Sequence, residues 1–171
     1  MLIRRIMHQG LARLAFKWPY LSERLTRSFV PLESEEIPWA EVSKPLNQSR
    51  IALVTTAGLH HRSQQKFNMT DTCGDPSFRV LDVASIEGDY AITHDYYDHW
   101  DAERDLNIVF PIARLNEMHT AGCIGSLAER HFSFMGHIKG PHVATLVAET
   151  APRMATMLKQ DQVDVVLLTP A

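Results

Sequence analysis

The chain has 171 residues, of which 45% are hydrophobic and 22% charged, and its formal net charge is −3. This composition is ordinary for a single globular domain and excludes disordered and fibrous proteins. The mild acidity argues against a nucleic-acid-binding protein, and the two cysteines, Cys73 and Cys123, exclude a disulfide-rich scaffold and favour a reducing, cytoplasmic compartment.

Residues 1–29 predict an amphipathic helix, because apolar side chains recur there at helical spacing and basic ones precede the first acid, Glu23. We expect this helix to lie on the domain, and a transit peptide or a membrane-surface helix are the alternatives. Residues 30–49 contain three prolines and several acids, which predict an extended connector. Residues 50–171 then form one α/β domain, without a run of about 18 apolar residues that could cross a membrane.

Short apolar runs predict the strands of this domain. Residues 51–54 and 163–168 are typical of strands buried on both faces. Weaker candidates lie at 79–84 and 89–93, and residues 131–136 fit either a strand or a packed turn.

Helix signals dominate the second half of the chain. Pro111 and Gly122 are placed to start and stop one helix. A longer helix begins at Gly140-Pro141, and Pro152 should kink or divide it. Strands alternating with helices predict an α/β fold, with a mainly parallel sheet flanked by helices in a three-layer αβα, Rossmann-like arrangement.

The carboxyl ends of the strands are the places where such sheets bind ligands. The strand that ends near residue 54 leads into Thr55, Thr56 and His60. Their hydroxyl and imidazole groups, among small residues that let a ligand approach the backbone, predict a substrate-binding segment.

The densest polar cluster is THDYYDHWDAERD, residues 93–105. One hypothesis is acid/base chemistry, because a histidine beside a carboxylate can move a proton near neutral pH. Another is a zinc site, because the segment from His94 to His99 resembles the HxHxDH motif of metallo-β-lactamase-like hydrolases, with Tyr96 at the second histidine. The third is structural: the acids cap a helix at 101–106.

Taken in order, the motifs resemble the selenoprotein B family of glycine, sarcosine, betaine and D-proline reductases. The resemblance covers about residues 37 to 170. The segments that carry it are IPW (37–39), KPL (44–46), RIALVTTAGLH (50–60), GDPSFR (74–79), HDYYD (94–98), DLNIVFPIARL (105–115), GCIGSLAERHFSFMG (122–136) and VDVVLLTP (163–170).

The resemblance implies a selenol- or thiol-dependent oxidoreductase that reductively cleaves C–N bonds. In family members the strand that matches VDVVLLTP leads into a selenocysteine or cysteine, followed three positions later by another cysteine. We therefore expect this centre just after Ala171, in a chain truncated after its last strand at a selenocysteine codon. The chain itself would hold no cofactor, and zinc enters only under the hydrolase alternative.

The resemblance also suggests roles for individual residues. His94 or His99 would protonate the leaving group, and Asp95 or Asp98 would orient the imidazole. Substrate-binding residues would be Thr55, Thr56, His60 and Asn107. The expected partners are a small-molecule substrate and a thiol electron donor such as a thioredoxin-like protein, with no nucleic acid, and a homo-oligomer remains open. A zinc hydrolase using His94, Asp98 and His99 and a non-catalytic binding module of the same fold are the alternative functions.

Overall fold

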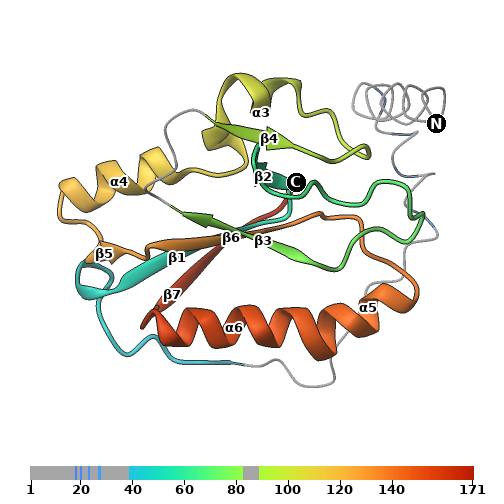
Figure 1. Ribbon diagram of the computed structural model, residues 1–171. Coiled ribbons are helices and arrows are strands. Elements are labelled where there is room, and N and C mark those ends of the chain that lie inside the picture. The colour runs from blue at the N-terminus through green and yellow to red at the C-terminus, as the bar shows by residue number, and fades with distance from the viewer. Residues whose placement is uncertain (1–17, 19, 21–22, 24–26, 28–38, 83–88) are drawn as a thin grey trace. The chain divides into compact units, whose positions relative to one another are not determined.

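A computed structural model describes residues 18, 20, 23, 27, 39–82 and 89–171 of the chain (Figure 1). The chain divides into two compact units, one formed by Met1–Ser43 with Asp95–Asp98 and the other by Lys44–His94 with His99–Ala171. The predicted N-terminal helix and most of the connector lie outside the described residues. The second unit contains every helix and strand considered below.

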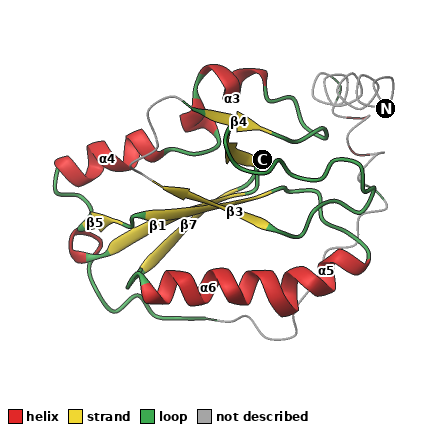
Figure 2. Ribbon diagram, in the orientation of Figure 1, coloured by secondary structure: helices red, strands yellow, loops and turns green. Residues whose placement is uncertain are grey.

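This unit contains both strands and helices (Figure 2), and its first four strands follow one another before the first α-helix. Its elements are the 3₁₀ turn η1 (Leu46–Gln48), β1 (Arg50–Thr55), β2 (Leu59–His61), β3 (Phe78–Asp82), β4 (Tyr90–Ile92), α3 (Trp100–Arg104), the 3₁₀ turn η3 (Leu106–Ile108), α4 (Ile112–Thr120), β5 (Ser126–Leu127), β6 (Arg130–Phe134), α5 (Pro141–Thr145), the π-helical turn η4 (Leu146–Thr150), α6 (Ala151–Gln160) and β7 (Val165–Thr169).

Strand β1 is the centre of the main sheet. It pairs in parallel with β5 and β6 along one edge and with β7 along the other. Its residues from Ile51 to Thr55 are all buried, which explains the unbroken apolar run in the sequence. Among the described residues β7 pairs only with β1, and its Leu167 and Leu168 are 41% and 67% exposed.

The two remaining strand pairs are antiparallel. Strand β3 pairs antiparallel with β6, so that Phe78 lies opposite Phe134 and the start of β3 meets the carboxyl end of β6. Strands β2 and β4 form a separate two-stranded antiparallel sheet. The mixed α/β fold with a mostly parallel main sheet is therefore confirmed, and the antiparallel strands are a feature that the apolar pattern did not predict.

Helices α5 and α6 run along one face of the main sheet (Figure 1). Leu158 of α6 joins a buried cluster with Val54 of β1 and Phe132 and Phe134 of β6. Pro152 lacks the N–H that a helix interior requires, and the π-helical turn η4 directly precedes the first turn of α6, where the ring is tolerated. The helical stretch continues without a gap from α5 through η4 into α6, and its change to π-helical hydrogen bonding comes directly before the residues at Pro152.

The opposite face carries α4 and the segment before it. The ring of Phe110 meets His131 of β6 edge to face, with 5.7 Å between ring centroids. Helix α4 stops where Gly122 adopts a φ of 70°, a left-handed conformation that glycine favours. None of the helices in the described part of the chain is long and apolar enough to cross a membrane.

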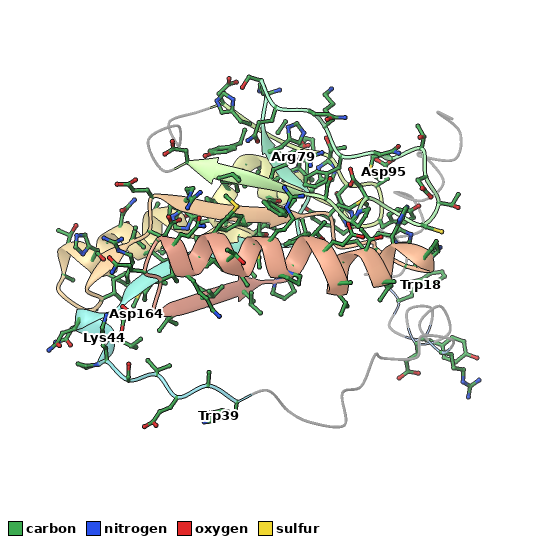
Figure 3. All side chains as sticks on the ribbon, turned by 60° about the horizontal axis from the view of Figure 1, so that its bottom comes forward. Trp18, Trp39, Lys44, Arg79, Asp95 and Asp164 are labelled. Carbon is green, nitrogen blue, oxygen red and sulfur yellow. The ribbon has the colours of Figure 1, made fainter. Side chains whose placement is uncertain are left out.

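An ion pair between Lys44 and Asp164 joins the start of this unit to the residues just before its last strand. The Lys44 Nζ lies 2.7 Å from the Oδ1 of Asp164, just before β7 (Figure 3). The backbone N–H of Arg50 donates to the other oxygen of the same carboxylate at 2.9 Å. These two contacts hold the pKa of Asp164 below its usual value.

Candidate functional site

The carboxyl ends of β1, β6 and β7 meet at one edge of the main sheet, because the three strands run in parallel. Thr56 follows β1, and its hydroxyl oxygen accepts a hydrogen bond from the Ala171 N–H at 3.0 Å. Gly136, which follows β6, lies close to both of these residues. A Cβ added to it would lie 3.1 Å from the Thr56 carbonyl oxygen and 3.3 Å from the Ala171 carbonyl oxygen. We call this edge the carboxyl edge.

Thr55, predicted to bind substrate, is fully buried at this edge. Its hydroxyl donates to the Val109 carbonyl at 2.8 Å, and the hydroxyl of Thr169 donates to the same oxygen at 2.8 Å. The two threonines thus fasten the segment before α4 to the ends of β1 and β7. Of the predicted pair, Thr56 is the one next to Ala171.

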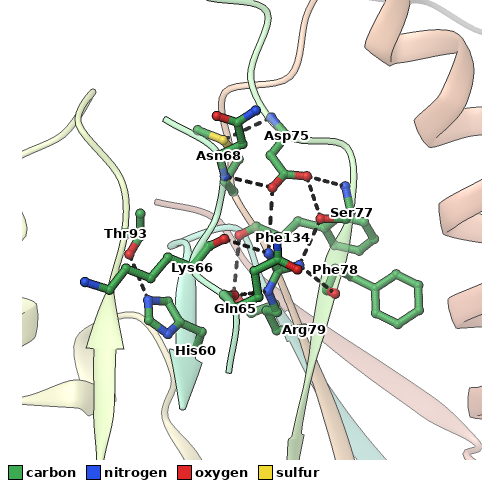
Figure 4. A network of polar contacts seen from close by, with 12 residues as sticks. His60, Gln65, Lys66, Asn68, Asp75, Ser77, Phe78, Arg79, Thr93 and Phe134 are labelled. Carbon is green, nitrogen blue, oxygen red and sulfur yellow. Dashed lines mark hydrogen bonds and ion pairs between the residues drawn. The ribbon is translucent and has the colours of Figure 1, made fainter. Parts of the chain in front are cut away.

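His60 is buried behind the carboxyl edge. Its Nδ1 lies 2.8 Å from the His61 carbonyl oxygen, which can only accept, so Nδ1 carries the proton. Its Nε2 then accepts from the Thr93 hydroxyl at 2.8 Å (Figure 4). Burial is the main cause that lowers the pKa of His60, and the ring is neutral near pH 7.

His94 follows β4 and lies against the chain after β1. A Cβ on Gly58 would lie 3.2 Å from the Cβ of His94 and would overlap the carbonyl oxygen of Thr93. Only 4% of His94 is exposed. Burial, followed by the charges of His137 and His99, lowers the pKa of His94 to about 4. The imidazole is therefore neutral near pH 7 and carries a proton on one of its two ring nitrogens.

The remaining predicted site residues differ from one another in their contacts and burial. His99 directly precedes α3, and its Nδ1 lies 2.7 Å from an oxygen of Glu103, four residues on. Asp95 is half-buried and Asp98 is exposed, and both belong to the first unit. Asn107 donates to Asp105 and accepts from the Ala113 N–H at 3.1 Å, so it holds the start of α4.

The loop before β3 also reaches the carboxyl edge, because β3 runs antiparallel to β6. The Asp75 N–H lies 3.2 Å from the sulfur of Met135, and Gly74, at a φ of 90°, packs on the carbonyl of His137. Within this loop Asp71 accepts from His142 at 2.9 Å and from the Cys73 N–H. Sequence reasoning missed His137, and the only signal was its position directly after the 131–136 strand candidate.

A network around Arg79 holds the middle of this loop (Figure 4). The guanidinium donates to the carbonyls of Gln65 and Lys66 and lies 4.2 Å from the centroid of the Phe67 ring. It also forms an ion pair with Asp75 at 3.7 Å. The loop between β2 and β3 is thereby fixed against the sheet.

Metal binding receives no support from this geometry. Within the described ranges, no three His, Cys, Asp or Glu side chains are arranged to hold a metal ion. The zinc hydrolase alternative is therefore left without a ligand set in that part of the chain.

Residues 22–171 match the family described as glycine/sarcosine/betaine reductase selenoprotein B. The chain is 36% identical over 141 residues to the D-proline reductase subunit gamma of Acetoanaerobium sticklandii, covering 82% of this chain and 56% of that protein. It is 28% identical over 137 residues to the glycine reductase complex component B subunit gamma of Carboxydothermus hydrogenoformans, covering 79% of this chain and 31% of that protein.

The chain thus spans about half of one relative and a third of the other. No solved structure is significantly similar to it. The comparisons identify the same family as the motifs between residues 37 and 170.

Proposed function

The chain belongs to the glycine/sarcosine/betaine reductase selenoprotein B family, and we propose that it forms part of a reductase that cleaves a C–N bond of a small molecule. The observation that carries the proposal is the family match over residues 22–171, which includes the whole main sheet and its carboxyl edge. The substrate binds at this edge, beside the ends of β1, β6 and β7.

Reducing power comes from a selenol or thiol with a second thiol, which together supply two electrons by closing a selenosulfide or disulfide. In family members this centre follows the strand that matches β7. The surroundings of Ala171 suit such a group: its N–H is held by Thr56, and Gly136 leaves space next to it because a side chain there would crowd both residues.

The residues of the chain bind the substrate and handle protons. Thr56 holds the substrate from the end of β1, while Thr55 and Asn107 keep the segment before α4 in place. A leaving nitrogen must be protonated as its bond to carbon breaks, and His94 or His99 supplies this proton; His94, whose ring is neutral, would do so from its ring N–H. Asp95 or Asp98 orients the imidazole, and His60 supports Thr93 next to His94.

Partners and compartment belong to the same proposal. Both relatives are named as subunits, one of D-proline reductase and one of a glycine reductase complex. We propose that this chain also works with partner subunits, and that a thioredoxin-like thiol protein regenerates the reduced centre. Cys73 and Cys123 are both free thiols, which suits a cytoplasmic protein.

Two measurements test the proposal. The nucleotide sequence after the codon for Ala171 is expected to contain an in-frame selenocysteine or cysteine codon, a cysteine codon three positions later and a helix-forming extension. The full gene product with dithiothreitol is then incubated with D-proline, glycine, sarcosine or betaine, and the reduced product is measured by mass spectrometry. Absence of the extension, or of product from all four compounds, contradicts the proposal and favours a binding module.

The His94→Ala variant of the full gene product tests the residue roles. We expect a loss of about 100-fold in kcat, the scale of general acid catalysis. His119→Ala is the matched control, because His119 lies on the exposed side of α4. Equal activity of the two variants contradicts the role of His94 and leaves the reductase itself standing.

A further inference from the structure

The last residue of β7 is bound to a segment that lies outside the sheet. Strands β1 and β7 pair in parallel, and Thr55 lies opposite Thr169 at the end of both strands. Residues paired in this way point to the same face of a sheet, and here both hydroxyls donate to the Val109 carbonyl oxygen at 2.8 Å. A carbonyl oxygen has two lone pairs, so these two donors satisfy it completely.

The Val109 carbonyl is a fixed point for this contact. Val109 directly follows η3, and its N–H donates back to the carbonyl of the first residue of that turn at 3.1 Å. Phe110, the next residue, is fully buried and meets His131 of β6 edge to face. Asn107, within η3, accepts from the Ala113 N–H in the first turn of α4. Val109 is therefore held by contacts that do not involve β7.

The chain that follows Thr169 is restrained at the same place. The Thr169 carbonyl accepts the Thr56 N–H at 3.1 Å, and the Thr56 hydroxyl accepts the Ala171 N–H at 3.0 Å. Between these two contacts the ring of Pro170 fixes its own φ. Each residue from Thr169 to Ala171 is thus restrained, and the backbone of Gly136 packs beside Thr56 and Ala171.

The outer side of β7 supplies no strand that could hold this end. Within the described part of the chain β7 pairs with β1 alone, and its Leu167 and Leu168 are exposed. The end of a strand that is paired on one side only opens more easily than a central strand. The hydroxyl of Thr169 opposes such opening, because it binds the end of β7 to a segment that is fixed independently of the sheet edge.

We propose that Thr169 is a positioning residue of the candidate site: its hydrogen bond to Val109 fixes the end of β7, and with it the group that follows this strand, at the carboxyl edge. The inference rests on the proposed function and deepens it, since the reacting selenol or thiol in that function follows β7. Thr169 acts through the backbone of residues 169–171, and Thr55 binds the same oxygen from the central strand.

Backbone order parameters of the 171-residue chain test the proposal without any assay of activity. They are measured by ¹⁵N relaxation for the N–H groups of Thr169 and Ala171 in the wild type, in Thr169→Val and in Thr169→Ser. We expect values near those of rigid backbone, about 0.85, in the wild type and a fall toward about 0.6 in Thr169→Val. Thr169→Ser keeps the hydroxyl and is expected to keep the wild-type values.

Two controls separate a local effect from a general one. The Leu53 N–H, which is bonded to His131 in the middle of β1, should keep its order parameter in every variant. Thr156→Val removes a hydroxyl that bonds the Pro152 carbonyl on an exposed turn of α6, and it should leave Thr169 and Ala171 as rigid as in the wild type. Unchanged order parameters of these two groups in Thr169→Val overturn the proposal.

Activity of the full gene product supplies the second readout, at a temperature where every variant is folded. Thr169→Val is expected to lower kcat by about 100-fold with little change in KM, the scale of a displacement of about 1 Å between reacting groups. Thr169→Ser should restore most of kcat, and Thr156→Val should leave it unchanged. Unchanged kcat in Thr169→Val overturns the role, whereas an inactive wild type contradicts only the reductase and leaves the order parameters to decide on the end of β7.

Discussion

The hydroxyl of Thr93 donates a hydrogen bond to Nε2 of His60 at 2.8 Å, although 33 residues separate them in the chain. Because the other ring nitrogen of His60 is bound to a carbonyl, this hydroxyl is the partner that satisfies the buried imidazole. The contact also positions the residue directly before His94. This hydrogen bond between Thr93 and His60 thereby helps to position His94, and we assign it no part in the proposed chemistry.

Replacing Thr93 by Val keeps the shape of the side chain and removes this donor. The buried His60 Nε2 then lacks its hydrogen bond, and we expect the free energy of unfolding to fall by about 1 to 3 kcal/mol. Urea unfolding followed by circular dichroism measures the change. Thr120→Val is the control, since the Thr120 hydroxyl bonds only the Asn116 carbonyl on an exposed turn of α4. Equal losses in both variants would contradict the role given to Thr93.

Acidification should destabilise the fold through buried histidines. Burial lowers the pKa of His131 to about 4, and its Nδ1 accepts the Leu53 N–H at 2.8 Å, which requires an unprotonated nitrogen. The unfolded chain binds the proton near pH 6.5 and the folded one only near pH 4, so stability is complete above 6.5 and declines between these values.

The expected loss is up to about 3 kcal/mol for such a histidine. Urea unfolding of the wild type and of His131→Gln, measured from pH 7.5 to 4, tests it. The variant is less stable at neutral pH, because glutamine does not reproduce the packing of the fully buried His131 ring, and its stability depends less on pH. A pH dependence as steep as that of the wild type would show that other groups cause it.

Gly74 should tolerate no side chain. Its φ is 90°, and a Cβ would overlap the His137 carbonyl oxygen. We expect Gly74→Ala to lower the free energy of unfolding by about 2 kcal/mol or more, from backbone strain and displacement of the loop. Gly122→Ala is the matched control: its φ is 70° but nothing lies within 4 Å of the added Cβ, so only the strain of about 1 kcal/mol is expected. Thermal unfolding of both variants makes the comparison.

Arg79→Lys should loosen the loop between β2 and β3. A lysine keeps the charge but cannot reach the Gln65 and Lys66 carbonyls together while covering the Phe67 ring. We expect a loss of about 1 to 3 kcal/mol and faster amide hydrogen exchange in residues 62–77. Arg153→Lys, whose guanidinium lies 5.9 Å from the Phe78 ring centroid, should change neither. Unchanged exchange in Arg79→Lys would contradict the anchoring role.

Much of the fold could be predicted because its strongest signals are local. The apolar runs at 51–54 and 163–168 correspond to the buried β1 and to β7, and Pro111 and Gly122 flank α4. Strand direction has no such signal: β3 has apolar residues at three of its five positions, and nothing in them shows that it pairs antiparallel. Strand β5 has two residues and forms only because β1 lies next to it.

The candidate site was only partly predictable for the same reason. His94 was found because it belongs to a dense polar cluster, and its burial came from the approach of Gly58, which the sequence does not reveal. His137 lies among apolar and glycine residues, so only the pairing of β6 with β1 shows that it reaches the carboxyl edge. The buried role of Thr55 likewise depends on Val109, which is 54 residues away.

The central position of β1 has a consequence for how the protein is made. β1 is the first strand of the sheet to leave the ribosome, but Ile51 pairs with Leu127 on one edge and with Val165 on the other. One edge of this strongly apolar strand therefore stays open until β5 and β6 have been translated, and the other until β7 has been. Closing loops of this length is slow, and unpaired apolar strands aggregate readily. Production at low temperature or with chaperones should raise the yield of folded chain more than any change at its surface.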